Sequence, residues 1–194
     1  EITCRDWSSD VCSSDLGTSF YDAICPTELG IYFYSDKLHS IYRLTEGLEA
    51  LSDTKGMKSY FEGTPWTACL TAYDKANREV LFTPMIDTTP QKTLVFSGYI
   101  DAFSSFYTLG LDATAYDVYS YITFDKYLLS SNNGGSSYYL HNFGNWSEYY
   151  GVDQTSTLSL IVNPAKTNVV TYHVAEWITR SEERRVGKEC RSRW

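Results

Sequence analysis

Hydrophobic and polar positions alternate in short runs along most of the chain. Gly30–Ser35 and His39–Leu44 alternate with a period of two and flank a polar turn, so they predict two paired strands. Thr67–Tyr73 and Glu79–Thr83 flank a loop that contains Asp and Asn, which predicts a β-hairpin. Further runs of this kind predict strands at Lys92–Ser97, Ala102–Thr108, Tyr116–Ile122, Lys126–Ser130, Tyr138–His141, Thr157–Val162 and Asn168–Val174.

Helical patterning is confined to one stretch, Ser52–Phe61. Ser52 is a suitable N-cap for this helix, whereas Gly56 weakens it. The predicted strands lie about 8–12 residues apart and are rich in Tyr, Phe, Val and Thr, which is typical of sandwiches, barrels and propellers. Because no helix of normal length alternates with the strands, the pattern predicts an all-β fold with a minor helix and antiparallel sheets.

One internal segment breaks the alternation. Pro84–Pro90 contains two prolines and has no period. We therefore expect a linker at residues 85–91, between one β segment at 17–84, which the resemblance described below implies to be propeller-like, and a second antiparallel β segment at 92–179.

The two ends of the chain have a different character. Asp6–Leu16 and Arg180–Trp194 can each be back-translated, without a break, into a common short-read sequencing adaptor. The alternative is an ordinary Ser/Asp-rich tail and an ordinary basic tail. We expect residues 1–16 and 180–194 to be adaptor-derived and non-native, and Gly17–Thr179 to be an internal fragment of a longer gene.

Charge and composition narrow the function classes. The net charge is −8, and it stays at −8 without the two ends, because they hold seven of the 16 basic and seven of the 24 acidic residues. An acidic chain is poorly suited to binding a nucleic-acid backbone. The 17 Tyr and 9 Phe residues supply material for a packed core. No apolar run is long enough to predict a transmembrane helix.

The sequence contains no recognisable metal, cofactor or nucleophile motif. Without the two ends, two of the five cysteines remain, Cys25 and Cys69, and they form no CxxC pair. His39, His141 and His173 have no ligand spacing. There is no GxSxG elbow and no phosphate-binding glycine loop. We therefore expect no catalytic, cofactor-binding or metal-binding residues, while a Cys25–Cys69 disulfide stays open.

Carbohydrate chemistry is the strongest alternative on composition. Paired carboxylates can cleave glycosidic bonds, and Tyr and Trp can stack on sugars. However, Asp36, Asp74, Asp87 and Asp153 lie in turn-like segments, where Asp commonly binds local backbone groups. The aromatic residues lie mostly at alternating strand positions, as core or cross-strand residues do.

Several segments together carry a family resemblance. They are GIYFYSDKLHSIYRLTEGLEALSDTKGMKSYF, TAYDKANREVLFT, KTLVFSGYIDAFSSFYTLG, YYLHNFGNWSEYYG and STLSLIVNP, in that order. Together they resemble the tail stabilisation or muzzle-type structural proteins of crAss-like phages, over nearly all of residues 30–177. The first segment resembles a propeller-like blade of those proteins, which are far longer than this chain.

The resemblance implies a virion structural role in a tailed bacteriophage, near the portal and tail, without catalysis or cofactor. It implies other virion proteins as partners and a homo-oligomeric ring around the DNA exit channel in the full-length protein. It implies no membrane and no specific nucleic-acid binding, only passing DNA, which an acidic wall would repel. The expected location is the phage tail, after synthesis in the bacterial host cytoplasm.

The residues of interest are then structural. We expect Asp74, Asn77 and Gly144 to hold turns. We expect the strand-packing residues to be Phe103, Phe106, Tyr107, Tyr139 and Leu140. The alternatives are an extracellular carbohydrate-binding or carbohydrate-cleaving β-propeller, with two carboxylates in a pocket lined by Tyr or Trp, and a receptor-binding fibre domain, whose trimeric stem the sequence does not show.

Overall fold

The computed structural model describes residues 16–63, 66–87, 89–110, 118–132, 137–145, 148–155 and 157. The chain divides into two compact units, Glu1–Ser156 and Thr157–Trp194, and the described residues up to 155 belong to the first. Apart from Thr157, the strands predicted at 157–162 and 168–174 lie outside the described residues. The two ends also lie outside them, apart from Leu16. In the described part, antiparallel sheets and two short helices confirm the all-β class, and no helix is long and apolar enough to cross a membrane.

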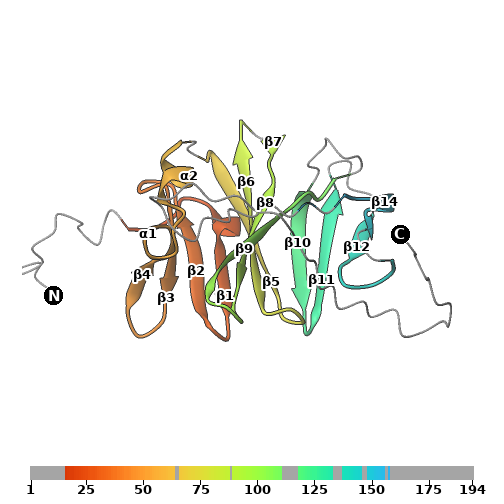
Figure 1. Cartoon of the computed structure of the whole chain (residues 1–194), viewed down its shortest axis with the longest axis horizontal. Helices are drawn as coiled ribbons and strands as arrows, with labels where there is room; N and C mark the ends of the chain where they lie inside the picture. The colour runs from red at the N-terminus through yellow and green to blue at the C-terminus, as the bar shows by residue number, and fades with distance from the viewer. Residues whose placement is uncertain are drawn as a thin grey trace, which may run out of the picture. The chain divides into compact units, whose positions relative to one another are not determined.

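The first sheet is an antiparallel meander in chain order (Figure 1). Its strands are β1 (Ile24–Thr27), β2 (Gly30–Ser35), β3 (Ser40–Leu44) and β4 (Leu48–Ala50), and a 3-10 helix, η1 (Tyr21–Ala23), precedes them. The alternation predicted β2 and β3 but missed β1 and β4. β1 contains Pro26, which is compatible with a strand at a sheet edge, and β4 has only three residues.

The second sheet extends across the segment that was expected to be a linker. It contains β5 (Ala68–Asp74), β6 (Glu79–Ile86), β8 (Thr93–Ser97) and β9 (Ala102–Tyr107), while the short β7 (Thr89–Pro90) pairs with the end of β6. Residues 85–91 therefore form the end of β6 and its return through β7, and the strands on either side of them pair directly. The expected boundary at this point does not separate two sheets. The two prolines are accommodated because the Pro84 carbonyl accepts the Gln91 N–H at 2.8 Å.

The third sheet contains β10 (Val118–Phe124), β11 (Tyr127–Asn132) and β12 (Tyr138–Leu140). A separate two-stranded ribbon, β13 (Glu148–Tyr149) and β14 (Val152–Asp153), follows it. The first strands of successive sheets are neighbours, since β5 contacts both β1 and β10.

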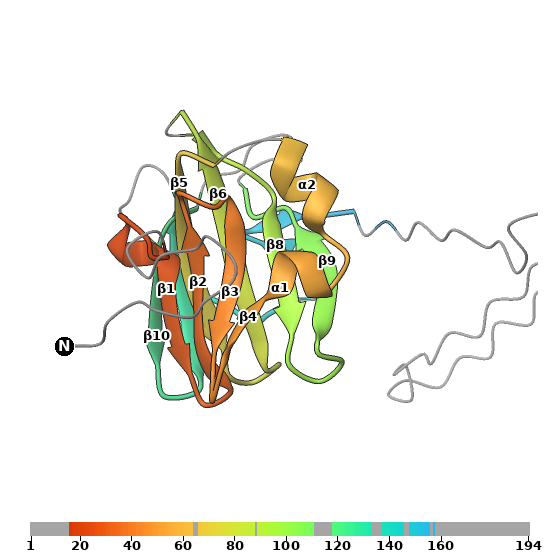
Figure 2. The same ribbon diagram turned by 90° about the vertical axis from the view of Figure 1, so that its left-hand side faces the viewer.

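Two helical turns replace the single predicted helix. α1 (Leu51–Thr54) and α2 (Lys58–Gly63) flank Gly56, whose φ of +81° is outside the right-handed helical region. α2 packs on β9, where the centroid of the Tyr60 ring lies 5.5 Å from the centroid of the Phe106 ring. α1 contacts β3 and β4, and Figure 2 shows it following directly on β4.

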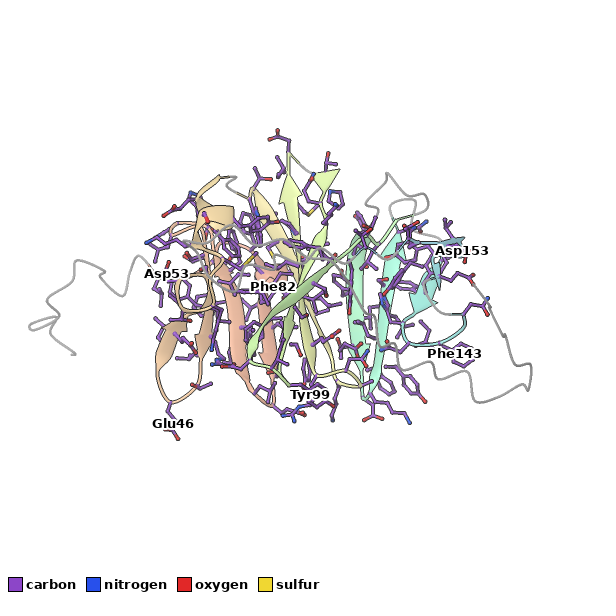
Figure 3. The ribbon with its side chains drawn as sticks, viewed as in Figure 1. Glu46, Asp53, Phe82, Tyr99, Phe143 and Asp153 are labelled. Carbon is purple, nitrogen blue, oxygen red and sulfur yellow. The ribbon has the colours of Figure 1, made fainter. Side chains whose placement is uncertain are left out.

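The second sheet is buried on both faces, and its sequence reflects this. One face contributes Val80, Phe82 and Phe96 to a core shared with the first sheet. The other face contributes Leu81 and Val95, which pack with Leu128 of the third sheet. Figure 3 places Phe82 among the strands in the middle of the molecule. β6 and β8 are therefore buried over consecutive residues, as strands covered on both faces are, whereas exposed or half-buried residues alternate with buried ones along Ile31–Tyr34 of β2.

Candidate functional site

A cavity of about 730 Å³ lies between the β5–β6 hairpin of the second sheet and the β12–β14 region. Leu81 and Leu128 form part of its apolar lining. The aromatic lining residues are Tyr107, Tyr139, Phe143, Tyr149 and Tyr150. The polar lining residues are Asp74, Asn77, Glu79, His141, Asn142, Asn145 and Glu148.

Asp74 ties the two sides of the cavity together. Its Oδ1 accepts the backbone N–H groups of Ala76 and Asn77 at 3.0 and 3.3 Å, which closes an Asx turn. Its Oδ2 accepts the side-chain amides of Asn77 and Asn142 at 3.0 and 2.7 Å. Asn77 also donates to Asn142 Oδ1 at 2.9 Å, which completes a triangle of side chains. Both oxygens of this buried carboxylate are therefore occupied.

Glu79 and Tyr107 meet from neighbouring parts of the second sheet. The Tyr107 hydroxyl donates to Glu79 Oε2 at 3.0 Å. The pKa of Glu79 is raised, chiefly by burial. The charge of Asp74 adds to this rise, whereas the hydrogen bond from Tyr107 opposes it. The pKa of Tyr107 is also raised, first by burial and then by the charge of Glu79. Both side chains of this pair line the cavity directly.

Ser130, His141 and Tyr150 form a hydrogen-bonded cluster beside the cavity. Ser130 Oγ lies 2.6 Å from His141 Nε2 and 2.8 Å from the Tyr150 hydroxyl. A Ser–His pair at this distance can activate a nucleophile when substrate reaches it. Here the Ser130 side chain is fully buried, so a substrate carbonyl does not reach Oγ. Burial also lowers the pKa of His141, although Asp74 opposes this, so the imidazole is held neutral as a structural partner.

Of the other residues singled out from the sequence, Tyr139, Leu140 and Gly144 also line the cavity, whereas Phe103 and Phe106 do not. The Tyr139 ring lies 4.5 Å from the Tyr150 ring, and Leu140 pairs with Leu129 across β11 and β12. Gly144 has a φ of +102° in the loop after β12, a conformation that favours glycine. Phe103 packs against the core shared with the first sheet. Phe106 is 45% exposed, although its ring contacts Tyr60.

Sequence reasoning missed most of the cavity. Glu79, Tyr149 and Asn142 carried no motif, because they come together only through contacts between distant strands and loops. Asn142 lies 68 residues from the carboxylate it binds. Asn142 adopts a positive φ of 60°, which Asn tolerates better than most residues, but the residue type alone does not predict the contact with Asp74.

The two cysteines of the described region are both buried and are not joined in a disulfide. Burial raises the pKa of Cys25 to about 12 and also raises that of Cys69. Such thiols stay protonated and are poor nucleophiles. Within the described residues, no group of three or more His, Cys, Asp and Glu side chains is arranged to hold a metal ion.

The chain matches the model of a known protein family. The model of the family described as Crassvirus muzzle protein (crAss_MUZ) matches residues 9–134. The matched range includes residues 9–16, part of the segment that back-translation assigns to an adaptor, so that assignment stays a prediction. No curated protein matches the chain.

Proposed function

Because the chain belongs to the Crassvirus muzzle protein family, we propose that this bacteriophage virion structural protein is positioned near the portal, in the tail, around the DNA exit channel. The family match over residues 9–134 carries the proposal. Its partners are other virion proteins, and it forms a homo-oligomeric ring within the particle. It acts there without catalysis, after synthesis in the cytoplasm of the bacterial host.

The charge of the chain supports a channel-side position. A net charge of −8 disfavours adhesion to phosphate, so DNA would pass without being held. The engaged side chains support a role without catalysis. Asp74 has both oxygens occupied, and Ser130 is fully buried.

We also propose that the three sheets are blades of a propeller-like arrangement. Each main sheet is an antiparallel meander, and the first strands of successive sheets are neighbours. The face of the first sheet that points away from the second is apolar. Its exposed residues are Ile24, Ile31, Leu44 and Leu48, each 40–46% exposed. A further blade stacked there would bury these side chains.

Leu44→Glu tests the propeller arrangement. A further blade would place the new carboxylate in a buried, apolar contact, so the variant protein in assembled particles should be destabilised or fail to incorporate. The isolated chain should tolerate the same change, because Leu44 is exposed there. Equal tolerance in both settings would contradict the proposal.

Labelling of purified virions tests the position in the particle. Antibodies raised against this chain, followed by gold-labelled electron microscopy, should mark the tail next to the portal. Mass spectrometry of the same particles should recover peptides from residues 17–157. Labelling of the capsid shell, or recovery of these peptides only from infected-cell lysate, would overturn the proposal.

A further inference from the structure

The cavity beside the β5–β6 hairpin has features that a structural role does not require. Its volume of about 730 Å³ lies within the range of about 300–1,000 Å³ that is common for small-ligand sites. Phe143 is 83% exposed where it borders the cavity, and Figure 3 shows it at the outside of the molecule. A large aromatic ring that is exposed beside a cavity offers a flat surface to a ligand.

The lining charges disfavour anionic ligands. Asp74, Glu79 and Glu148 line the cavity, and none of the described lining residues is a Lys or Arg. A phosphate or a nucleotide would meet carboxylates with no cation to offset its charge. The ligand class is therefore neutral or cationic.

The carboxylates are also poorly arranged for a bound cation. Each one already accepts from an uncharged donor: Asp74 from amides, Glu79 from the Tyr107 hydroxyl, and Glu148 from Asn145 Nδ2 at 2.7 Å. Burial, the largest influence on Glu79, disfavours its charged form. A neutral ligand avoids the cost of removing a cation from water.

Hydrogen-bonding capacity remains where a ligand would enter. Within the described residues, the second oxygen of Glu79 and that of Glu148 have no hydrogen-bond partner. These acceptors lie along a lining that includes the rings of Tyr107 and Tyr149, whose centroids are 6.1 Å apart. This combination matches a ligand that contains a ring with hydroxyl groups. The hydroxyl groups would donate to the carboxylates, and the apolar face of the ring would contact the aromatic side chains.

We propose that this cavity binds a neutral saccharide, with Phe143 and Tyr149 contacting the sugar rings and Glu79 and Glu148 accepting from its hydroxyls. Binding is independent of the position of the protein in the virion, so the labelling experiment above and the one below can fail separately.

Titration of the whole chain with neutral oligosaccharides tests the proposal. The probes are maltohexaose, cellohexaose, xylohexaose and chitohexaose, measured by isothermal titration calorimetry and ligand-observed NMR. At least one should bind, and Phe143→Ala and Glu148→Gln should each weaken its binding by about tenfold, equivalent to about 1.4 kcal/mol. Phe124→Ala is the matched control, because Phe124 is 73% exposed and does not line the cavity.

Circular dichroism and thermal melts first establish that each variant is folded, and backbone NMR shifts then locate the site. Perturbations at residues 139–145 and 148–151 support the proposal. It is overturned if no oligosaccharide binds, if Phe124→Ala weakens binding as much as Phe143→Ala, or if the shifts map elsewhere. Tighter binding of hexalysine or of inorganic phosphate than of any oligosaccharide would also overturn it.

Discussion

A single carboxylate, Asp74, organises the loops around the cavity. Its four hydrogen bonds join a turn in the second sheet to the loop after β12. The sequence assigned Asp74 and Asn77 to a turn, and the additional bond to Asn142 gives the same carboxylate a long-range role.

Asp74→Ala should therefore destabilise the protein by about 1–3 kcal/mol, because the turn and the loop after β12 lose four hydrogen bonds to a buried, charged acceptor. Urea denaturation followed by circular dichroism measures the change. Asp153→Ala is the control, since Asp153 is an exposed carboxylate in β14 (Figure 3). A loss of less than about 0.5 kcal/mol for Asp74→Ala would contradict the clamp role, because that is the range of ordinary surface substitutions.

His141 should make stability depend on pH near neutrality. Burial lowers its folded-state pKa below the ordinary value of 6.5, so the unfolded chain binds a proton at a higher pH than the native protein does. Stability should therefore fall as pH drops below about 6.5 and continue to fall until the folded-state pKa is reached.

Denaturation at a series of pH values from about 7 to 5 measures this loss. His141→Gln should remove most of the dependence in that window, whereas His39→Gln, at an exposed position, should leave it in place. An NMR titration in which His141 protonates at its ordinary pKa would contradict the expectation.

At the scale of elements, the middle sheet is the main source of packing energy. Its strands contribute to cores on both faces, whereas the first sheet has one exposed apolar face. Leucines on these two sheets therefore differ in burial.

Leu81→Ala and Leu48→Ala form a matched pair. Leu81 is 2% exposed, so its truncation should cost about 2–5 kcal/mol through lost burial and a cavity. Leu48 is 46% exposed, so its truncation should cost less than about 1 kcal/mol in the isolated chain. Equal losses in chemical denaturation would contradict the central position of the second sheet.

At the scale of the molecule, an ion-pair network joins the first two sheets. Arg43 of β3 contacts Glu49 at 2.5 Å and Asp101, in the β8–β9 turn, at 2.6 Å. Lys55 contacts the same Asp101 at 2.5 Å. The Lys55 hydrogen bond is the largest influence on Asp101 and lowers its pKa, and the Arg43 hydrogen bond does the same for Glu49.

Asp101→Asn should cost about 1 kcal/mol at neutral pH and low salt, and less at high salt, because Asp101 is half exposed. Since both carboxyl pKa values are lowered in the folded state, the stabilisation is present above about pH 4 and is lost on further acidification. The variant should therefore lose less stability than the wild type below pH 4. Asp53→Asn, a carboxylate outside this network, is the control. An unchanged acid profile in Asp101→Asn would rule out this contribution.

The sequence by itself determined the local conformation and the family. The period of two at residues 30–35 predicted β2 with the bounds that the structure shows. Such a period is a local property of a strand with one buried face, so it is visible in the sequence. The family resemblance followed from the order of several such segments, and the family match agrees with it.

Only the tertiary structure decided which strands and side chains meet. Residues 85–91 broke the alternation and were expected to be a linker, yet β6 and β8 pair across them. The cavity was equally hidden, because Glu79, Asn142 and Tyr149 carry no shared motif and come together only through contacts between distant segments. Local periodicity contains no information about such contacts, since they are selected by the burial of whole sheet faces against one another.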